Sequence, residues 1–168
     1  MSQVENYTRP IKRTKTPEQA LSLLMRQCAR AEKCSGDALR SMRRWGLSDE
    51  DARNVLDRLL KERFIDDSRY AAAYVREKSR LGGWGVRKIV ASLRAKRVAP
   101  KVIEEAVGQL SSEDTASRLE EVLRKKAAKT TARDAYELKG KIVRFGISRG
   151  FDLDDVIATT ERILRESE

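Results

Sequence analysis

The stretch Gly46-Leu47-Ser48 has two counterparts of the same form in this chain, Arg97-Val98-Ala99 and Gly150-Phe151-Asp152. Each stretch lies between two segments whose apolar residues recur at the spacing of an α-helix. The central apolar residues of the three stretches are 51 and then 53 positions apart. Self-similarity at such a period is typical of repeat proteins, so we predict three tandem units of about 50 residues.

Each unit contains three segments with helical spacing, and the stretches above join the second segment to the third. Thr16, Pro17 and Gln19 form the start signal of the first predicted helix, in which Gln19 completes a capping box with Thr16. Gly46 can end the second helix in the left-handed conformation, and Ser48 can cap the third. The sequence therefore predicts an all-α protein of three tandem three-helix, helix-turn-helix-like repeats in an elongated, curved array. The predicted segments are a flexible basic N-terminal tail at residues 1–15 and repeats at residues 16–64, 65–111 and 112–168.

The composition fits a highly charged helical protein and excludes several other classes. Of 168 residues, 40% are apolar and 37% are charged, whereas only 5% are aromatic, which argues against a barrel or sandwich. No segment approaches the roughly 18 apolar residues of a membrane span, and residues 1–15 lack the apolar stretch of a secretory signal. We therefore expect a cytoplasmic protein. We also expect a monomer, because the charged faces of the terminal repeats can cap the array.

Residues that commonly carry catalysis or bind metals are scarce. The chain has no histidine, which removes Ser-His and Cys-His nucleophiles and the common zinc sites. Its two cysteines, Cys28 and Cys34, have a spacing that suits neither a metal-binding thiolate pair nor a disulfide framework. The acidic residues occur in runs at predicted helix starts, where they stabilise the helix dipole. We expect no catalytic residue, no metal and no cofactor, and therefore no enzyme.

Positive charge is concentrated on the second helix of each repeat. Residues 35–46 contain three basic and one acidic residue, residues 83–98 five basic and none acidic, and residues 132–151 five basic and two acidic. The third helices carry net negative charge. If the repeats stack with a regular rotation, the basic residues form a continuous stripe suited to a polyanion. The candidate contact residues are Arg43, Arg44, Arg87, Lys88, Arg94, Lys96, Arg97, Lys141, Arg144 and Arg149.

The helix dipole offers another explanation for part of this pattern. Basic residues near a helix C-terminus are favoured by roughly 0.3–1 kcal/mol each without any partner. This explanation applies to the five candidates nearest the turns, which are Arg43, Arg44, Lys96, Arg97 and Arg149. Arg87 and Lys88 lie at the start of their predicted helix, where a cation is disfavoured, so they have the better claim to a function.

The glycine-rich segment and the two tryptophans each permit two interpretations. Gly82-Gly83-Trp84-Gly85 lacks the spacing of a phosphate-binding loop and follows no predicted strand, so we predict a break between helices. Trp45 and Trp84 could stack on nucleic-acid bases. Each flanks a turn between apolar helix faces, however, and this position favours core packing.

A helix-turn-helix DNA-binding protein, acting in transcription or chromatin, is the alternative function. A tight turn joins the second and third helices of each repeat, as in that motif. Recognition helices contact bases near their N-terminus, yet the third helices of the first and third repeats begin with the acidic residues Asp49, Glu50 and Asp51 or Asp152, Asp154 and Asp155. Those charges oppose entry into the groove of duplex DNA. An adaptor that binds only protein is a third possibility.

A longer motif identifies a family resemblance. Residues 64–71 read Phe-Ile-Asp-Asp-Ser-Arg-Tyr-Ala, and they are followed by Tyr74-Val75 and by Gly83 and Gly85 before a basic helix. This pattern closely resembles the signature of the RecX family, bacterial regulators of the RecA recombinase. Residues 141–151 resemble the family's C-terminal motif, and the resemblance extends over residues 17–165.

Three positions depart from the family pattern. Arg63 and Arg97 stand where glycine is common, and Gly146 stands where leucine is expected. Gly146 is expected to weaken its helix by about 0.5–1 kcal/mol relative to alanine. The third repeat is therefore expected to be the least stable.

The resemblance implies an inhibitor that lies in the groove of the RecA filament on single-stranded DNA, with weak direct contact to duplex DNA. Members of the family inhibit strand exchange, ATP hydrolysis and co-protease stimulation by the filament. They thereby modulate recombinational DNA repair and the SOS response. In this hypothesis the ATPase chemistry belongs to RecA, and the basic second helices contact DNA phosphate or an acidic filament surface.

Overall fold

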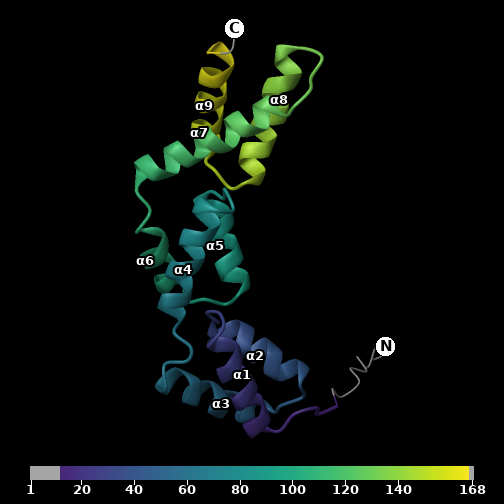
Figure 1. Ribbon diagram of the computed structural model, residues 1–168, viewed down its shortest axis with the longest axis vertical. Coiled ribbons are helices and arrows are strands. Elements are labelled where there is room, and N and C mark those ends of the chain that lie inside the picture. The colour runs from purple at the N-terminus through teal and green to yellow at the C-terminus, as the bar shows by residue number, and fades with distance from the viewer. Residues whose placement is uncertain (1–11, 167–168) are drawn as a thin grey trace, which may run out of the picture. The chain divides into compact units, whose positions relative to one another are not determined.

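The computed structural model describes residues 12–166, and within them every regular element is an α-helix. Figure 1 shows these helices in chain order. Their bounds are α1 (Pro17–Cys28), α2 (Ser35–Arg44), α3 (Asp49–Lys61), α4 (Asp67–Arg80), α5 (Val86–Ala95), α6 (Pro100–Val107), α7 (Ser112–Ala128), α8 (Ala135–Ser148) and α9 (Leu153–Arg165). The all-α fold predicted from the sequence is confirmed. The helices also fall into the predicted groups of three, with the boundaries near residues 64 and 111 lying between helices.

The first repeat comprises α1, α2 and α3 and has a core of its own. Helix α3 packs against both α1 and α2. The predicted capping box is present at α1, because the Thr16 hydroxyl accepts from Gln19 N and Gln19 Oε1 accepts from Thr16 N. The buried core residues are Ala20, Leu24, Ala38, Met42, Leu47, Ala52, Val55, Leu56, Leu59 and Ile65. Helical spacing places most of these apolar residues on the inner faces, and Leu47 and Ile65 enter the core from the segments between helices.

The three turns between second and third helices share one conformation. The first residue of each turn has a positive φ, which is 77° at Gly46, 60° at Arg97 and 88° at Gly150. The next residue is buried in every case, and its N–H donates to a carbonyl of the last helical turn, as in Leu47 N to Met42 O at 3.1 Å. This pattern is the Schellman type of helix ending. The third turn residue occupies the N-cap position of the next helix, and the side chains of Ser48 and Asp152 accept a capping hydrogen bond there.

The chain divides into two compact units at Asp67, and the second unit contains the second and third repeats. In the second repeat α5 packs against α6, and the hydroxyls of Tyr74 on α4 and Ser92 on α5 lie 2.6 Å apart. In the third repeat each of α7, α8 and α9 packs against the other two. Their shared core consists of Leu119, Leu123, Ile142, Phe151, Val156 and Ile163.

Gly146 has a packing role that its helix propensity alone does not reveal. It is buried on α8, and a Cβ at this position would lie 2.7 Å from Val156 Cγ1 on α9 and 3.2 Å from Leu123 Cδ2 on α7. The first distance is too short for a side-chain carbon, and the second is tighter than an ordinary van der Waals contact. Glycine therefore allows α8 to approach its two neighbours closely, and the expectation that the third repeat is the least stable stays a prediction.

Part of the predicted N-terminal tail packs on the first repeat. Thr14 N donates to Trp45 O at 2.8 Å, and Arg13 pairs with Asp51 at 3.3 Å. A Cβ at Gly46 would lie 2.7 Å from Arg13 Cα, so the absence of a side chain at Gly46 allows the backbone of Arg13 to approach this turn. The rest of the tail, residues 1–11, lies outside the described residues. Among residues 12–166 no helix is long and apolar enough to cross a membrane.

Candidate nucleic-acid interface

The basic residues of α2 are exposed at the end of that helix. Arg43 Nε lies 3.8 Å from Asp49 Oδ1 across the turn, and Arg44 donates to the Ser41 hydroxyl at 3.4 Å. Both contacts are long and solvent-exposed, and exposed pairs of this kind contribute roughly 0–1 kcal/mol. The two guanidinium groups therefore remain available to an external anion.

Arg87 and Lys88, at the start of α5, have partners in the third repeat. Arg87 Nη2 lies 2.7 Å from Oδ2 of Asp152, the residue that caps α9. Lys88 Nζ lies 4.6 Å from the centre of the Trp84 ring and donates to Ser148 O at 3.4 Å. These contacts account for cations at a helix start without any external partner. A direct role of both residues in filament binding stays a prediction.

The glycine-rich segment brings the backbones of the second and third repeats together. Gly85 N donates to Arg149 O at 2.8 Å, and Arg87 N donates to Gly150 O at 3.1 Å. A Cβ at Gly85 would lie 2.3 Å from Gly150 O, so only glycine fits this approach. The break between helices is confirmed, since α4 ends at Arg80 and α5 begins at Val86. The Gly85 N–H is also already bonded within the protein.

The end of α5 and the middle of α8 present arginines without internal partners. Arg94, Arg97 and Arg144 are exposed, and none forms an ion pair or side-chain hydrogen bond with another residue between 12 and 166. Lys96 differs, because its Nζ lies 5.9 Å from the centre of the Tyr70 ring. The three arginines are thus the members of the predicted stripe most available for contact.

Lys141 and Arg149 are held within the third repeat. Lys141 pairs with Glu137 at 3.0 Å and donates to Thr131 O at 2.8 Å. Hydrogen bonds from Arg133 N and from the side chains of Lys141 and Arg133, in this order, lower the pKa of Glu137 to about 2. The guanidinium of Arg149 lies 5.2 Å from the centre of the Phe145 ring.

Both tryptophans pack inside their own units. Trp45 is partly buried against the core of the first repeat, and Lys15 Nζ lies 5.5 Å from its ring centre. Trp84 is half-buried and has Lys78 Nζ at 5.6 Å and Lys88 Nζ at 4.6 Å from its ring centre. Since lysine side chains of the protein already contact the faces of these rings, core packing explains the two tryptophans better than base stacking.

Sequence reasoning missed a group of cations outside the second helices. They surround a cavity of about 340 Å³ in the second unit, which we call the basic cavity. Its lining residues are Arg80, Leu81, Gly82, Gly83, Arg118, Glu121, Val122, Lys125, Lys126, Lys129, Phe145 and Arg149. The signal that could have found it is the spacing of Arg118, Lys125 and Lys129, which places them on one face of a helix.

The chain matches two family models in succession. Residues 66–107 match the model described as RecX, second three-helix domain, and residues 112–158 match the model described as RecX, third three-helix domain. Both matches lie within the second compact unit, apart from residues 66 and 67. They also fall within the second and third repeats predicted from the sequence.

Relatives named Regulatory protein RecX are similar over much of the chain. The one from Mycolicibacterium vanbaalenii is 28% identical over 155 residues, covering 86% of this chain and 84% of the relative. The one from Neisseria meningitidis is 39% identical over 113 residues, covering 65% and 67%. The chain spans only 51% of two relatives from Clostridium botulinum.

The fold is similar to that of a solved structure. The crystal structure of RecX from Lactobacillus salivarius superposes with a TM-score of 0.74 at 15% sequence identity. The match covers 88% of this chain and 96% of that one. At this level of identity the likeness concerns the fold alone.

Proposed function

Because the chain belongs to the RecX family of regulatory proteins, we propose that it inhibits the RecA recombinase by binding in the groove of the RecA filament on single-stranded DNA. The observation that carries this proposal is the match to two consecutive RecX domains. In this role the protein modulates recombinational repair and the SOS response in the cytoplasm. It catalyses no reaction of its own, and ATP hydrolysis belongs to the filament.

The exposed arginines without internal partners support this function physically. Arg94, Arg97 and Arg144 present planar guanidinium groups, which bind phosphate or carboxylate through two parallel hydrogen bonds. The net charge of the chain is +10, and such an excess attracts a polyanion over a distance set by the salt concentration. Both features suit a filament whose core is nucleic acid.

The position of α9 argues against the helix-turn-helix alternative. A recognition helix needs its N-terminal turn free to enter the major groove. In this protein Asp152, which caps α9, pairs with Arg87 of α5, and Asp154 and Asp155 follow it. The first turn of α9 is therefore acidic and engaged within the second unit.

The experiment is co-sedimentation of the protein with RecA filaments, followed by a strand-exchange assay. We expect the wild-type chain to pellet with the filament and to inhibit exchange. A variant with Arg94, Arg97 and Arg144 all changed to glutamate should inhibit at least tenfold less strongly. The variant should fold like the wild type, because the three side chains are exposed and lack internal partners. Circular dichroism checks this.

A matched control separates the position of these charges from their number. Changing Arg26, Arg53 and Lys61 to glutamate alters the net charge by the same amount, and these residues are also exposed. The control should inhibit like the wild type. A wild-type chain that neither pellets with filaments nor slows exchange would refute the proposed function, and so would sequence-specific binding to duplex DNA without RecA.

A further inference from the structure

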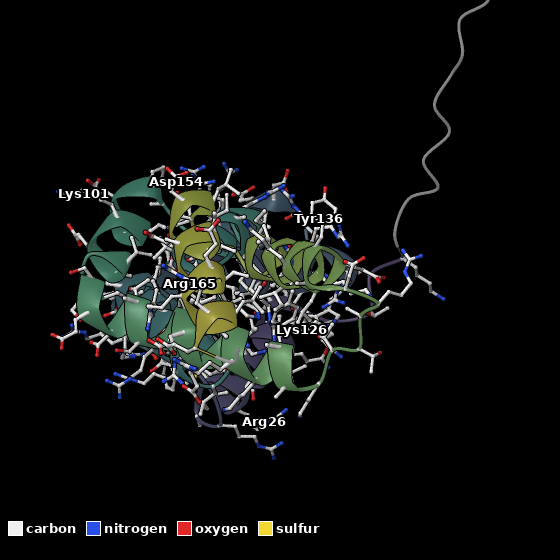
Figure 2. The ribbon with its side chains drawn as sticks, turned by 90° about the horizontal axis from the view of Figure 1, so that it is seen from above. Arg26, Lys101, Lys126, Tyr136, Asp154 and Arg165 are labelled. Atoms are coloured by element: carbon white, nitrogen blue, oxygen red, sulfur yellow. The ribbon has the colours of Figure 1, made fainter. Side chains whose placement is uncertain are left out.

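The basic cavity has one wall formed by a single face of α7. Arg118 and Lys125 stand at positions i and i+7 of the helix, with Val122 between them on the same face, and Lys129 follows as the C-cap residue of the helix. At the edge of this face lies Lys126, which Figure 2 labels on α7. A helix rises by about 1.5 Å per residue, so the row from Arg118 to Lys129 is about 16 Å long.

The opposite wall comes from the end of α4 and from α8. Arg80 and Leu81 lead into Gly82 and Gly83, and Phe145 and Arg149 complete the lining. Gly83 has a φ of 59°, and a Cβ there would lie 2.9 Å from Val122 Cγ2. The glycine therefore lets the loop of the second repeat approach the basic face of α7 in the third.

The charges around the cavity are unbalanced. Six of the lining side chains are basic and one, Glu121, is acidic. Glu121 is already engaged by Lys125 and Arg118. A hydrogen bond from Lys125 and the charges of Arg118 and Lys125 lower its pKa, so it stays ionised. Arg80, Lys126, Lys129 and Arg149 have no carboxylate partner among residues 12–166, and their mutual repulsion favours an external anion.

One donor in this group lacks an acceptor. The Nε of Arg149 is buried and forms no hydrogen bond within the described structure. Two cations lie over the same ring, because Lys126 Nζ and the Arg149 guanidinium are each 5.2 Å from the centre of Phe145. A buried N–H without an acceptor costs free energy, and a bound anion oxygen would remove that cost.

We propose that the basic cavity binds consecutive phosphates of a single-stranded DNA backbone. This inference rests on the proposed function and deepens it, because it assigns DNA contact to residues outside the predicted stripe, Arg149 excepted. The length of the cationic row on α7 suits several phosphates, whereas a free nucleotide would engage only one end. Phe145, the aromatic residue of the lining, is already occupied by its two cations and offers no stacking surface to a base. The contact is therefore independent of DNA sequence.

The test measures binding of the full chain to dye-labelled oligo(dT) by fluorescence anisotropy at several salt concentrations. For single strands, the slope of log K against log salt changes by about 0.7 for each phosphate contact. The variant that changes Arg80 and Lys129 to glutamate should bind at least tenfold more weakly than the wild type. Its slope should be shallower by about 1.4.

The matched control changes Lys101 and Arg165 to glutamate. Both are exposed cations of the same compact unit, both lie outside the cavity, and Figure 2 labels both. The control should keep the wild-type slope. A second variant, Arg80→Gln with Lys129→Gln, removes the two charges without adding negative charge. It should also weaken binding to oligo(dT), and it serves as the test if the glutamate variant fails to fold.

Two results would overturn the inference. One is an Arg80 and Lys129 variant that folds and binds oligo(dT) with the affinity and slope of the wild type. The other is inorganic triphosphate displacing the oligonucleotide as effectively as unlabelled oligo(dT) at equal phosphate concentration, which would make the cavity a site for small polyphosphates. The proposed function fails separately, through a wild-type chain that binds oligo(dT) but leaves RecA strand exchange unchanged.

Discussion

Two arginines occupy turn positions whose backbone conformation favours glycine. Arg63 has a φ of 59° and Arg97 a φ of 60°. A side chain in this left-handed region costs of order 1–3 kcal/mol. The family resemblance of the sequence leads to an expectation of glycine at both places, and these two departures coincide with local strain.

Replacing either arginine by glycine should therefore stabilise the protein. For Arg97→Gly we expect a gain of about 1 kcal/mol, because relief of strain exceeds the extra flexibility of glycine in the unfolded chain. Urea unfolding followed by circular dichroism measures the change. Arg97→Ala is the control, since alanine retains the Cβ that causes the strain. An equal gain from alanine would contradict the explanation.

Alanine substitutions at the two glycines of α8 should change the stability of the protein in opposite directions. Gly146→Ala should destabilise the protein by about 1–3 kcal/mol, because the added carbon overpacks the contact with Val156 and Leu123. Gly140→Ala should stabilise it by about 0.5–1 kcal/mol, since its Cβ would come no closer than 3.5 Å to another residue and alanine favours the helix. Thermal unfolding of both variants measures this. A stabilising Gly146→Ala change would show that propensity outweighs packing here.

At the scale of the helices, a network of charges joins α7 to α9. Glu120 on α7 lies 2.9 Å from Arg162 on α9 and 2.8 Å from Arg124, and Arg124 also pairs with Glu166. Hydrogen bonds from Arg162 and then from Arg124 lower the pKa of Glu120 to about 2. Because the network is solvent-exposed, salt should weaken it.

The network makes the stability of the third repeat depend on acid. The pKa of Glu120 is lower in the folded chain than the usual 4.5, so its contribution is complete above that pH and is lost as the pH falls toward 2. At pH 7 the variant Glu120→Gln should melt below the wild type. The gap in Tm should close near pH 2. It should also shrink in 0.5 M salt, because the Debye length falls from about 10 Å at 0.1 M salt toward about 3 Å at 1 M. A gap that is constant from pH 7 to pH 2 would mean that the charge of Glu120 has no role.

Gly85 is one of the glycines that allow the close contact between the second and third repeats. A Cβ at Gly85 would collide with Gly150 O, which is a backbone atom held by its own turn. Gly85→Ala should therefore cost at least about 1–3 kcal/mol and should expose the amides of Gly85 and Arg87 to hydrogen exchange. Gly140→Ala, whose Cβ would meet only side-chain atoms of Arg144 at 3.5 Å or more, is the control. Unchanged protection of the two amides would refute the role of Gly85.

At the scale of the whole molecule, the fold could be predicted because its signals are local. The capping box of Thr16 and Gln19, the turn at Gly46 and the spacing of the buried leucines each depend on residues within a few positions of one another. Repetition of these signals in three units made the grouping of the helices clear. The curvature of the array, which depends on how the units stack, stays a prediction.

The candidate site was less predictable because its contacts join distant parts of the chain. Asp152 lies 65 positions from Arg87, and Ser148 lies 60 positions from Lys88, so no local pattern reveals that these cations already have partners. The basic cavity was missed for a different reason. Its row on α7 has clear helical spacing, but charge was compared only between the second and third helices of each repeat.

Each compact unit contains one tryptophan, Trp45 in the first and Trp84 in the second. Intrinsic fluorescence therefore offers a separate optical probe of each half of the protein without any added label. In a Trp84→Phe chain the emission reports only on the first unit, and in a Trp45→Phe chain only on the second. Because Trp84 stacks with Lys88 beside the junction of the last two repeats, its emission should also register the moment at which that junction opens.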